Sequence, residues 1–379
     1  MYINFWYVAA ESKDVIDDPV HSRMLGQDFV LFRDREGEVQ CLSNVCTHRG
    51  GSLADGKIKG DCVECPYHGW QFDGAGTCRS IPSLDPSTKI PERSRIDSYP
   101  VDERYGLIHV FLGDLPAAER PPIMNIPEWG EDSWRPTALV FNADFDYKRS
   151  VENALDPAHN EFTHTTHIDK ARGESFHVPP LKLTEGDWGS NFDLEMPAPA
   201  MFEKKMRAVS GKDKPSMFRI RAGYHGVSCF WTYIEPTPKF FRHQYFFETP
   251  IDVGKTRIYS VAFRNSMLEP KDDARMIKMD NLVVGEDVKV LRGVRPLVTP
   301  PNNTKEVLVP ADSHIARYRE WLAEWEEKGY HIDLEEVKRT RDNSAYAIPS
   351  PARRTSQNWA LDPIPLLPGK EVKAKAVGN

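Results

Sequence analysis

Cys46-Thr-His48-Arg-Gly and Cys65-Pro-Tyr-His68-Gly-Trp are the two segments that decide the fold of this sequence. Each segment offers one thiolate and one imidazole, at a spacing that a short turn can present at the tip of a loop. Glycines follow both histidines, and they let backbone approach a metal group closely. The two segments therefore predict one four-ligand metal site built by two loops.

Two kinds of metal group compete for two cysteines and two histidines. Zinc accepts this ligand set, but familiar zinc modules pair cysteine with cysteine and histidine with histidine. Here each loop carries one of each. The mixed arrangement favours a [2Fe–2S] cluster in which Cys46 and Cys65 hold one iron, and His48 and His68 hold the other.

The composition limits the class of protein. The chain has 379 residues, a net charge of −7 and a pI of about 6.0, which argues against nucleic acid or an anionic membrane as a partner. We see no apolar stretch of the roughly 20 residues that a membrane helix needs, and the first residues do not read as a signal peptide. We therefore expect a cytoplasmic protein. Cysteines outside the two loops, such as Cys41, Cys62 and Cys78, are expected to be reduced core residues.

The pattern along the chain predicts an α+β fold with two main parts. Residues 1–115 combine short apolar runs with glycine turns, which is typical of an all-β domain. Residues 116–365 begin with a proline-rich linker and continue as an α+β domain with an antiparallel sheet flanked by helices. Helices are expected near 150–165, 270–293 and 313–328. Residues 366–379 are expected to be a flexible tail.

A second group of ligands lies in Glu152-Asn-Ala-Leu-Asp156-Pro-Ala-His159-Asn-Glu-Phe-Thr-His164. Five residues separate the two histidines, so a straight helix would not aim both imidazoles at one point. The helix must be distorted or end near Phe162. Two imidazoles and a carboxylate from elsewhere would form the facial triad of non-haem Fe(II) oxygenases.

These segments resemble the Rieske non-haem iron oxygenases. The two cysteine–histidine loops look like the Rieske motif of aromatic-ring-hydroxylating oxygenases, with Gly51 and Tyr67 in place of the extra cysteines of respiratory Rieske proteins. The first part is then an all-β Rieske [2Fe–2S] domain. The opening residues 5–10, Phe-Trp-Tyr-Val-Ala-Ala, look like the monooxygenase and O-demethylase branch that has only α subunits.

The second ligand segment resembles the Asn-x-x-Asp-x-x-His-x4-His motif of the catalytic domains of this family, at Asn153, Asp156, His159 and His164. The family takes its third iron ligand from an Asp on a later helix. The best match is Asp287, with Glu286 and Asp280 as alternatives.

The resemblance implies the terminal oxygenase component of a multicomponent system. Its cofactors would be a Rieske [2Fe–2S] cluster and a mononuclear Fe(II). It would use O2 to hydroxylate or oxidatively demethylate a small aromatic or polycyclic substrate. A separate NAD(P)H-dependent reductase, acting directly or through a ferredoxin, would supply electrons, since the chain has no Gly-x-Gly-x-x-Gly segment.

In this family electrons cross between protomers of a homotrimer. Carried over to this chain, the path runs from His68 of one copy to Asp156 and His159 of the next. Asp156 and Asn153 are therefore assigned catalytic roles. For Asp156, capping of a helix before Pro157 is a competing interpretation.

Other functions remain open from the sequence. An aromatic-ring dioxygenase would use the same ligands, a Rieske electron carrier would need only the first part of the chain, and a structural zinc protein would contain no iron. Substrate contacts are expected within residues 190–265, with Met201, Phe202, Phe218, Phe230, Trp231 and Tyr233 as candidates. His167, His177, His225 and His243 match no motif and are expected to be ordinary.

Overall fold

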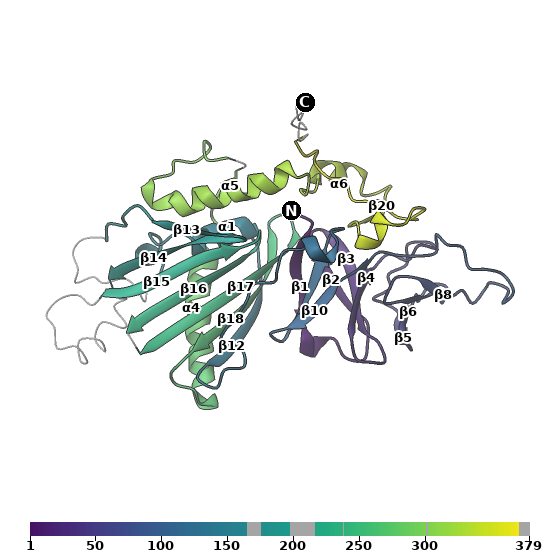
Figure 1. The fold of residues 1–379 in the computed structure, drawn as a ribbon, viewed down its shortest axis with the longest axis horizontal. Coiled ribbons are helices and arrows are strands. Elements are labelled where there is room, and N and C mark those ends of the chain that lie inside the picture. The colour runs from purple at the N-terminus through teal and green to yellow at the C-terminus, as the bar shows by residue number, and fades with distance from the viewer. Residues whose placement is uncertain (165–175, 198–216, 238, 301, 371–379) are drawn as a thin grey trace, which may run out of the picture. The chain divides into compact units, whose positions relative to one another are not determined.

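In the computed structural model, which describes residues 1–164, 176–197, 217–237, 239–300 and 302–370, the chain forms two compact units. Unit 1 consists of Met1–Pro121 and the chain from Leu322 onward, and unit 2 is Pro122–Trp321. Figure 1 shows the strands of both units and the helices of unit 2. The α+β class is confirmed: an all-β N-terminal part is followed by an antiparallel sheet with helices.

Three small antiparallel sheets build the N-terminal part of unit 1. One has the order β1-β11-β10, one β2-β3-β4-β9, and one β5-β6-β7-β8. Their bounds are β1 Phe5–Glu11, β2 Val20–Met24, β3 Gln27–Arg33, β4 Val39–Ser43, β5 Lys57–Lys59, β6 Cys62–Glu64, β7 Gln71–Asp73, β8 Cys78–Ser80, β9 Ser98–Tyr99, β10 Val101–Arg104 and β11 Leu107–Leu112. The strands are short because turns interrupt them, as at Gly37, whose φ of +85° suits glycine.

The two cysteine–histidine loops are held by the core of unit 1. The first follows β4 and the second connects β6 with β7. Cys46 and Cys65 belong to a buried cluster that also contains Val30, Phe32 and Phe72. Both loops therefore start from packed strands, which fixes the positions of the two thiols.

The C-terminal segment packs with the first strands rather than with the large sheet. It contains α6 Leu334–Thr340 and the parallel pair β19 Tyr346–Ala347 and β20 Asp362–Pro363. Tyr2 forms a bridge with His331, and the Tyr99 hydroxyl donates to the carbonyl of Ile348 at 2.7 Å. This grouping divides the chain differently from the predicted boundaries at 115 and 365, which stay predictions about independently folding domains.

Unit 2 is built on one seven-stranded antiparallel sheet of order β12-β18-β17-β16-β15-β14-β13. Its strands are β12 Arg135–Ala143, β13 Leu183–Gly186, β14 Gly189–Pro197, β15 Met217–His225, β16 Cys229–Thr237, β17 Phe240–Asp252 and β18 Lys255–Arg264. The helices are α1 Tyr147–Ala154, α2 Asn160–Thr163, α4 Asp273–Leu291 and α5 Ser313–Glu327. The helices expected near 270–293 and 313–328 are therefore confirmed as α4 and α5. Figure 1 shows α4 running behind the sheet.

Helices cover one face of this sheet, called here the helix face, which carries the even-numbered side chains of β15 to β18. Arg242 of β17 pairs with Asp280 of α4, and Arg264 of β18 pairs with Asp273 of α4. Side chains alternate between faces along a strand, so the odd-numbered residues point the other way. On that second face, Glu128 accepts a hydrogen bond from the Tyr245 hydroxyl at 2.6 Å.

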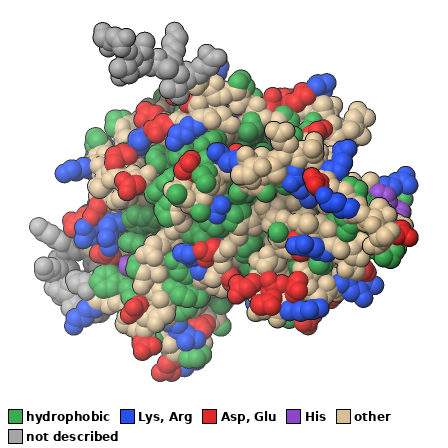
Figure 2. All heavy atoms as spheres, turned by 45° about the vertical axis from the view of Figure 1, so that its right-hand side comes forward, with side chains coloured by type: hydrophobic (Ala, Val, Ile, Leu, Met, Phe, Trp, Pro, Cys, Tyr) green, Lys and Arg blue, Asp and Glu red, His purple; other side chains and the backbone are tan. Residues whose placement is uncertain are grey.

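The surface is mixed in charge. On the face shown in Figure 2, acidic and basic side chains are interspersed, in keeping with a net charge of −7. Among the described residues, we find no helix with the length and apolar character needed to cross a membrane.

Candidate metal centres

The two cysteine–histidine loops have the same backbone hydrogen-bond pattern. In the first, Cys46 N–H donates to the Gly51 carbonyl and Gly50 N–H donates to the Cys46 carbonyl, both at 2.9 Å. In the second, Cys65 N–H donates to the Trp70 carbonyl at 2.8 Å and Gly69 N–H to the Cys65 carbonyl at 3.0 Å. Near its end, each loop needs one residue in the left-handed backbone conformation. Gly50 and Gly69 take this position, with φ of +72° and +71°.

The loops bring together the four side chains that the sequence selected. Cys46 and Cys65 are each 2% exposed and lie in hydrogen-bond contact with each other. The His48 and His68 rings are exposed, with centroids 4.4 Å apart. His48 stacks on Trp70, with centroids 4.6 Å apart and planes 4° apart.

The chemistry of this set fits a [2Fe–2S] cluster. Burial raises the pKa of the Cys46 thiol to about 12, so only a bound cation would keep it as a thiolate. A Cβ at Gly51 would lie 3.0 Å from Cys65 Sγ, so glycine keeps the approach to that sulfur open. Thr47 Oγ1 and Trp70 Nε1 are buried without a hydrogen-bond partner in the described part of the chain, and cluster sulfurs accept such bonds.

His159, His164 and Asp287 converge in unit 2, with candidate ligand atoms all within 4.8 Å of one another. Nε2 of each histidine lies 3.5 Å from Asp287 Oδ1. Nδ1 of His159 lies 2.6 Å from the Asp156 carbonyl oxygen, and Nδ1 of His164 lies 3.2 Å from Glu286 Oε2. Because these acceptors hold a proton on each Nδ1, both Nε2 lone pairs are left for a metal.

The short length of α2 makes this convergence possible, because the backbone is already extended at His164, which follows it. α1 ends at Ala154, and α2 begins only at Asn160. His159 and His164 are the residues just before and after α2, so they are not on one straight helix. Between the helices, Asp156 Oδ1 accepts from the N–H of Ala158 at 2.7 Å. The helix therefore ends near Phe162, which was one of the two expectations, and Asp156 accepts a local backbone hydrogen bond without capping α2, whose N-cap is His159.

The three carboxylates considered as the third ligand have different surroundings. Asp280 is 8% exposed and is paired with Arg242. Glu286 contacts Nδ1 of His164, on the outside of the group. Asp287 alone of the three lies among the ligand atoms, and Asn153 Nδ2 donates to its Oδ1 at 3.1 Å. Burial raises the pKa of Asp287, a cost that a bound cation would offset.

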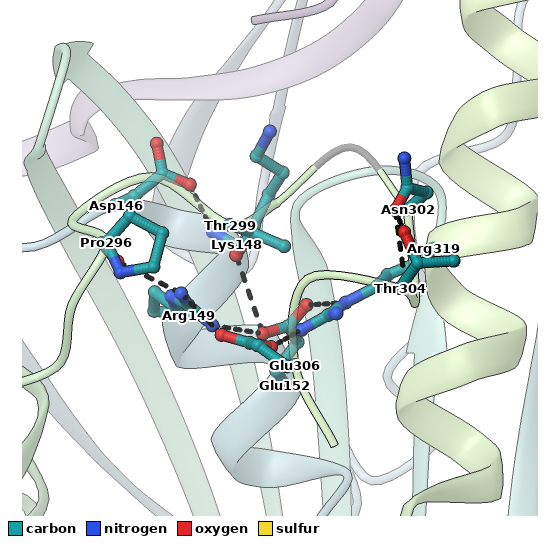
Figure 3. Close-up of polar contacts among 10 residues, drawn as sticks. All are labelled: Asp146, Lys148, Arg149, Glu152, Pro296, Thr299, Asn302, Thr304, Glu306 and Arg319. Atoms are coloured by element: carbon teal, nitrogen blue, oxygen red, sulfur yellow. Dashed lines mark hydrogen bonds and ion pairs between the residues drawn. The ribbon is translucent and has the colours of Figure 1, made fainter. Parts of the chain in front are cut away.

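A buried ionic network braces α1 beside this group. Arg149 and Glu152 of α1, Arg319 of α5 and Glu306 form a ring of alternating charge, which Figure 3 shows with its neighbours. Arg319 reaches Glu152 at 2.7 Å and Glu306 at 2.6 Å, and Arg149 reaches them at 3.3 and 2.9 Å. Glu152 directly precedes Asn153, so the ring holds the end of α1 that faces Asp287. The sequence analysis did not identify this network, whose members are up to 170 positions apart in the chain.

The sheet register places the predicted substrate contacts on different faces of the sheet. Phe230 points to the helix face, and its ring stacks on Phe246 at 4.4 Å. Phe218 is also on that face but belongs to the core cluster of β14 and β15. Trp231 and Tyr233 have odd numbers and point to the second face. Met201 and Phe202 lie outside the described residues.

Of the four histidines that match no motif, the three that the structure describes are not part of the metal group. His243 contacts Glu128 at 2.5 Å, and His225 Nε2 lies 2.8 Å from the Pro122 carbonyl oxygen. His177 is described but is not part of the group, and His167 lies outside the described residues.

Family models match both parts of the chain. Residues 5–100 match the Rieske [2Fe-2S] domain, and residues 143–328 match the vanillate O-demethylase oxygenase C-terminal domain. The fold and the two ligand sets thus define a protein with a Rieske cluster domain and a mononuclear iron domain. The chain belongs to the Rieske non-haem iron oxygenases, in the branch that contains the O-demethylases, and its cofactors are a [2Fe–2S] cluster and a mononuclear iron.

Relatives of known description are about one-third identical to this chain over the part that aligns. The iron-sulfur subunit of the toluene-4-sulfonate monooxygenase system of Comamonas testosteroni is 35% identical over 201 residues, which are 50% of this chain and 56% of that protein. The oxygenase component of dicamba O-demethylase from Stenotrophomonas maltophilia is 34% identical over 164 residues, 42% of this chain and 47% of that protein. The chain spans about half the length, or less, of the curated relatives it matches.

Solved structures show the same fold. Pseudomonas putida CBB5 NdmA with caffeine has a TM-score of 0.73 at 22% identity, covering 85% of this chain and 90% of that chain. Dicamba monooxygenase bound to 3,6-dichlorosalicylic acid has a TM-score of 0.69 at 24% identity, covering 85% and 96%.

Proposed function

We propose that this protein is the terminal oxygenase component of a multicomponent Rieske system. It uses O2, and electrons from a separate reductase, to hydroxylate or oxidatively demethylate an aromatic or polycyclic substrate. The observation that carries the proposal is the convergence of His159, His164 and Asp287 in a chain that also holds the paired cysteine–histidine loops. An electron carrier would not need the second ligand group.

Each residue of the two centres has a defined task in this proposal. Cys46 and Cys65 hold one iron of the cluster, and His48 and His68 hold the other. When bound, the cluster supplies one electron at a time, and the mononuclear iron supplies a redox-active Lewis acid. Two imidazoles and one carboxylate leave positions open for other ligands.

The residues around the mononuclear site orient its ligands. The carbonyl of Asp156 and the carboxylate of Glu286 hold the Nδ1 protons of His159 and His164. The Asn153 amide donates to Asp287 and fixes the direction of that carboxylate. Such contacts set the ring tautomer and the ligand geometry.

The path between the centres is also part of the proposal. Asp156 Oδ2 lies 3.7 Å from His159 Nδ1, and 22% of its side chain is exposed, so a second copy can reach it. His68 is exposed as well. In a homotrimer, His68 of one copy would contact Asp156 of the next and connect its cluster to His159. A ring is what a head-to-tail interface gives when it closes.

The partners follow from the same chemistry. A separate NAD(P)H-dependent reductase, directly or through a ferredoxin, provides the electrons, and the relatives include multicomponent systems such as the toluene-4-sulfonate monooxygenase. Monooxygenation is favoured over ring dihydroxylation, because the C-terminal family model is that of an O-demethylase. The cytoplasmic location stays a prediction.

Metal analysis with O2 uptake tests the proposal. Anaerobically purified protein should contain about three irons and two sulfides per chain, and reduced protein should consume O2 faster with an aromatic substrate. His159→Ala should lose the third iron and keep the cluster spectrum, whereas His21→Ala, a change at an exposed histidine, should lose neither. The proposed oxygenase function would be refuted if the protein contained zinc and no sulfide. It would also be refuted if the protein contained about two irons per chain and took up no more iron when Fe(II) was added.

A further inference from the structure

α1 packs on β15, β16 and β17 of the unit 2 sheet, and its end carries Asn153 beside the metal group. α1 is anchored at its start, where Thr256 Oγ1 donates to the Phe145 carbonyl at 2.9 Å. α4 is anchored near the other end of the same strands, where Asp280 pairs with Arg242. The two helices meet where Asn153 of α1 donates to Asp287 of α4.

Standard geometry then identifies the strand residues beneath the group. Asp287 lies two turns beyond Asp280, or about 10 Å along the helix axis. Along β17, Gln244 is about 7 Å and Phe246 about 13 Å from Arg242. Ser150 of α1 contacts Glu248 of β17, and Asn153 is one turn further along α1. We therefore take positions 246 and 244 of β17, with their partners on β16, as the strand positions nearest the metal group, and call them the floor.

One row of this floor crosses four strands and combines two small residues with two polar ones. Its four residues, in sheet order, are Ala262, Gln244, Thr232 and Ala222. The stacked rings of Phe246 and Phe230 occupy the next row. Gln244 and Thr232 are half-buried although they lie on central strands, so solvent reaches this part of the helix face. The flanking residues of the row, Ala222 and Ala262, each present only a methyl group.

The polar pair has a preferred orientation. The Thr232 hydroxyl donates to Gln244 Oε1 at 3.1 Å. This contact occupies the amide oxygen and leaves the amide N–H groups of Gln244 to donate elsewhere. The neighbouring cations of the helix face, Arg242 and Arg264, are already paired with Asp280 and Asp273. The row therefore offers neutral donors and no unpaired positive charge among the described residues.

We infer that Gln244, oriented by Thr232, selects the substrate by donating an amide hydrogen to an acceptor oxygen of an uncharged aromatic molecule. The inference rests on the proposed function and narrows its substrate class to neutral aromatics with a carbonyl or similar acceptor. None of the described residues in this row carries an unpaired cation, so a carboxylate or sulfonate would lose its hydration here without a compensating charge from them, which is unfavourable.

Calorimetric binding to anaerobic, iron-loaded protein tests this inference with three matched probes. They are 4-methoxyacetophenone, which carries the acceptor, 4-ethylanisole, which lacks the carbonyl, and 4-methoxybenzoate, which is anionic. The ketone should bind about three- to tenfold more tightly than the ethyl compound, the worth of one neutral hydrogen bond, and more tightly than the benzoate.

Four variants test whether Gln244 and Thr232 cause the preference for the ketone. Gln244→Leu should remove the preference for the ketone and leave the affinity for the ethyl probe within about twofold, because only the hydrogen bond is lost. Thr232→Val should weaken the preference, and Thr232→Ser should restore it. Tyr233→Phe, which removes a hydroxyl from the opposite face of β16, should change nothing.

Three results would overturn the inference: the ketone preference surviving in Gln244→Leu, the wild type favouring the benzoate, or no probe binding. Iron, sulfide and probe-dependent O2 uptake are measured on the same samples. If the protein contains about three irons per chain and the probes stimulate O2 uptake, but Gln244→Leu keeps the ketone preference, only this inference is refuted and the proposed function stands. Protein without the third iron refutes the proposed function.

Discussion

Replacing Glu286 tests how the structure holds the mononuclear iron. Glu286 Oε2 lies 3.2 Å from Nδ1 of His164, and Nε2 of the same ring faces Asp287. A carboxylate at Nδ1 fixes the ring and makes Nε2 a stronger ligand. Loss of such a contact typically costs 10- to 100-fold in metal affinity, or about 1.4–2.7 kcal/mol.

The two substitutions at this position separate charge from geometry. Glu286→Gln keeps an acceptor for the Nδ1 proton and loses only the negative charge, so we expect about a tenfold weaker Fe(II) site. Glu286→Ala removes the acceptor, so we expect the affinity for Fe(II) to fall about 100-fold. Competition with an Fe(II) chelator, on anaerobic protein with the cluster intact, measures both values.

A matched control removes general effects of charge. Glu269 is an exposed carboxylate that pairs with Lys271, and Glu269→Gln should leave the Fe(II) affinity unchanged. The reasoning is refuted if Glu286→Ala binds Fe(II) as tightly as the wild type. A loss of the cluster absorbance in Glu286→Ala would also contradict it, because Glu286 belongs to unit 2 and the cysteine–histidine loops belong to unit 1.

Four further outcomes are expected. Asp287→Ala should drop the mononuclear iron well below one per chain with an unchanged cluster spectrum, since one of three ligands is lost; full iron and activity would move the ligand to another carboxylate. Asp156→Asn should keep both metals and slow coupled turnover by about 10- to 100-fold, and wild-type turnover would remove its bridging role. Glu152→Gln should lower the free energy of unfolding by about 3 kcal/mol, because it leaves buried Arg319 and its neighbours with uncompensated charge; a thermal melt like that of the wild type would show that the ring adds nothing. Burial lowers the pKa of His109 to about 3 while the unfolded side chain titrates near 6.5, so the unfolded state binds more protons and stability should fall as the pH drops from about 6.5 towards 3; His109→Gln should flatten that fall in denaturant titrations at several pH values, and an equal slope would assign it to other groups.

Much of the fold could be predicted because the chain carries strong local signals. The 3.6-residue period around Met276 predicted α4, and the apolar run at 107–112 predicted β11. Helix and strand periods differ, so these elements were separable by pattern alone. The grouping of the C-terminal segment with the first strands could not be predicted, because single long-range contacts, such as that of Tyr99 with Ile348, leave no mark on local pattern.

The candidate site was predictable to the extent that its residues are close in sequence. The five-residue spacing of His159 and His164 indicated that one straight helix could not carry both, and α2 does end before His164. The face of the sheet was not predictable for Trp231 and Tyr233. Both faces of β16 carry aromatic residues, so composition could not distinguish the side that turns to the helices.

The sequence by itself determined the two cysteine–histidine loops, the pair of His159 and His164, the order of the two parts and the family, because ligand spacing within one segment is a local property. Only the tertiary structure decided which carboxylate joins His159 and His164, since Asp287 is more than 120 positions away from both. The same holds for the pair of Gln244 with Thr232. Strand register brings these side chains together, and register depends on the packing of the whole sheet rather than on any one segment.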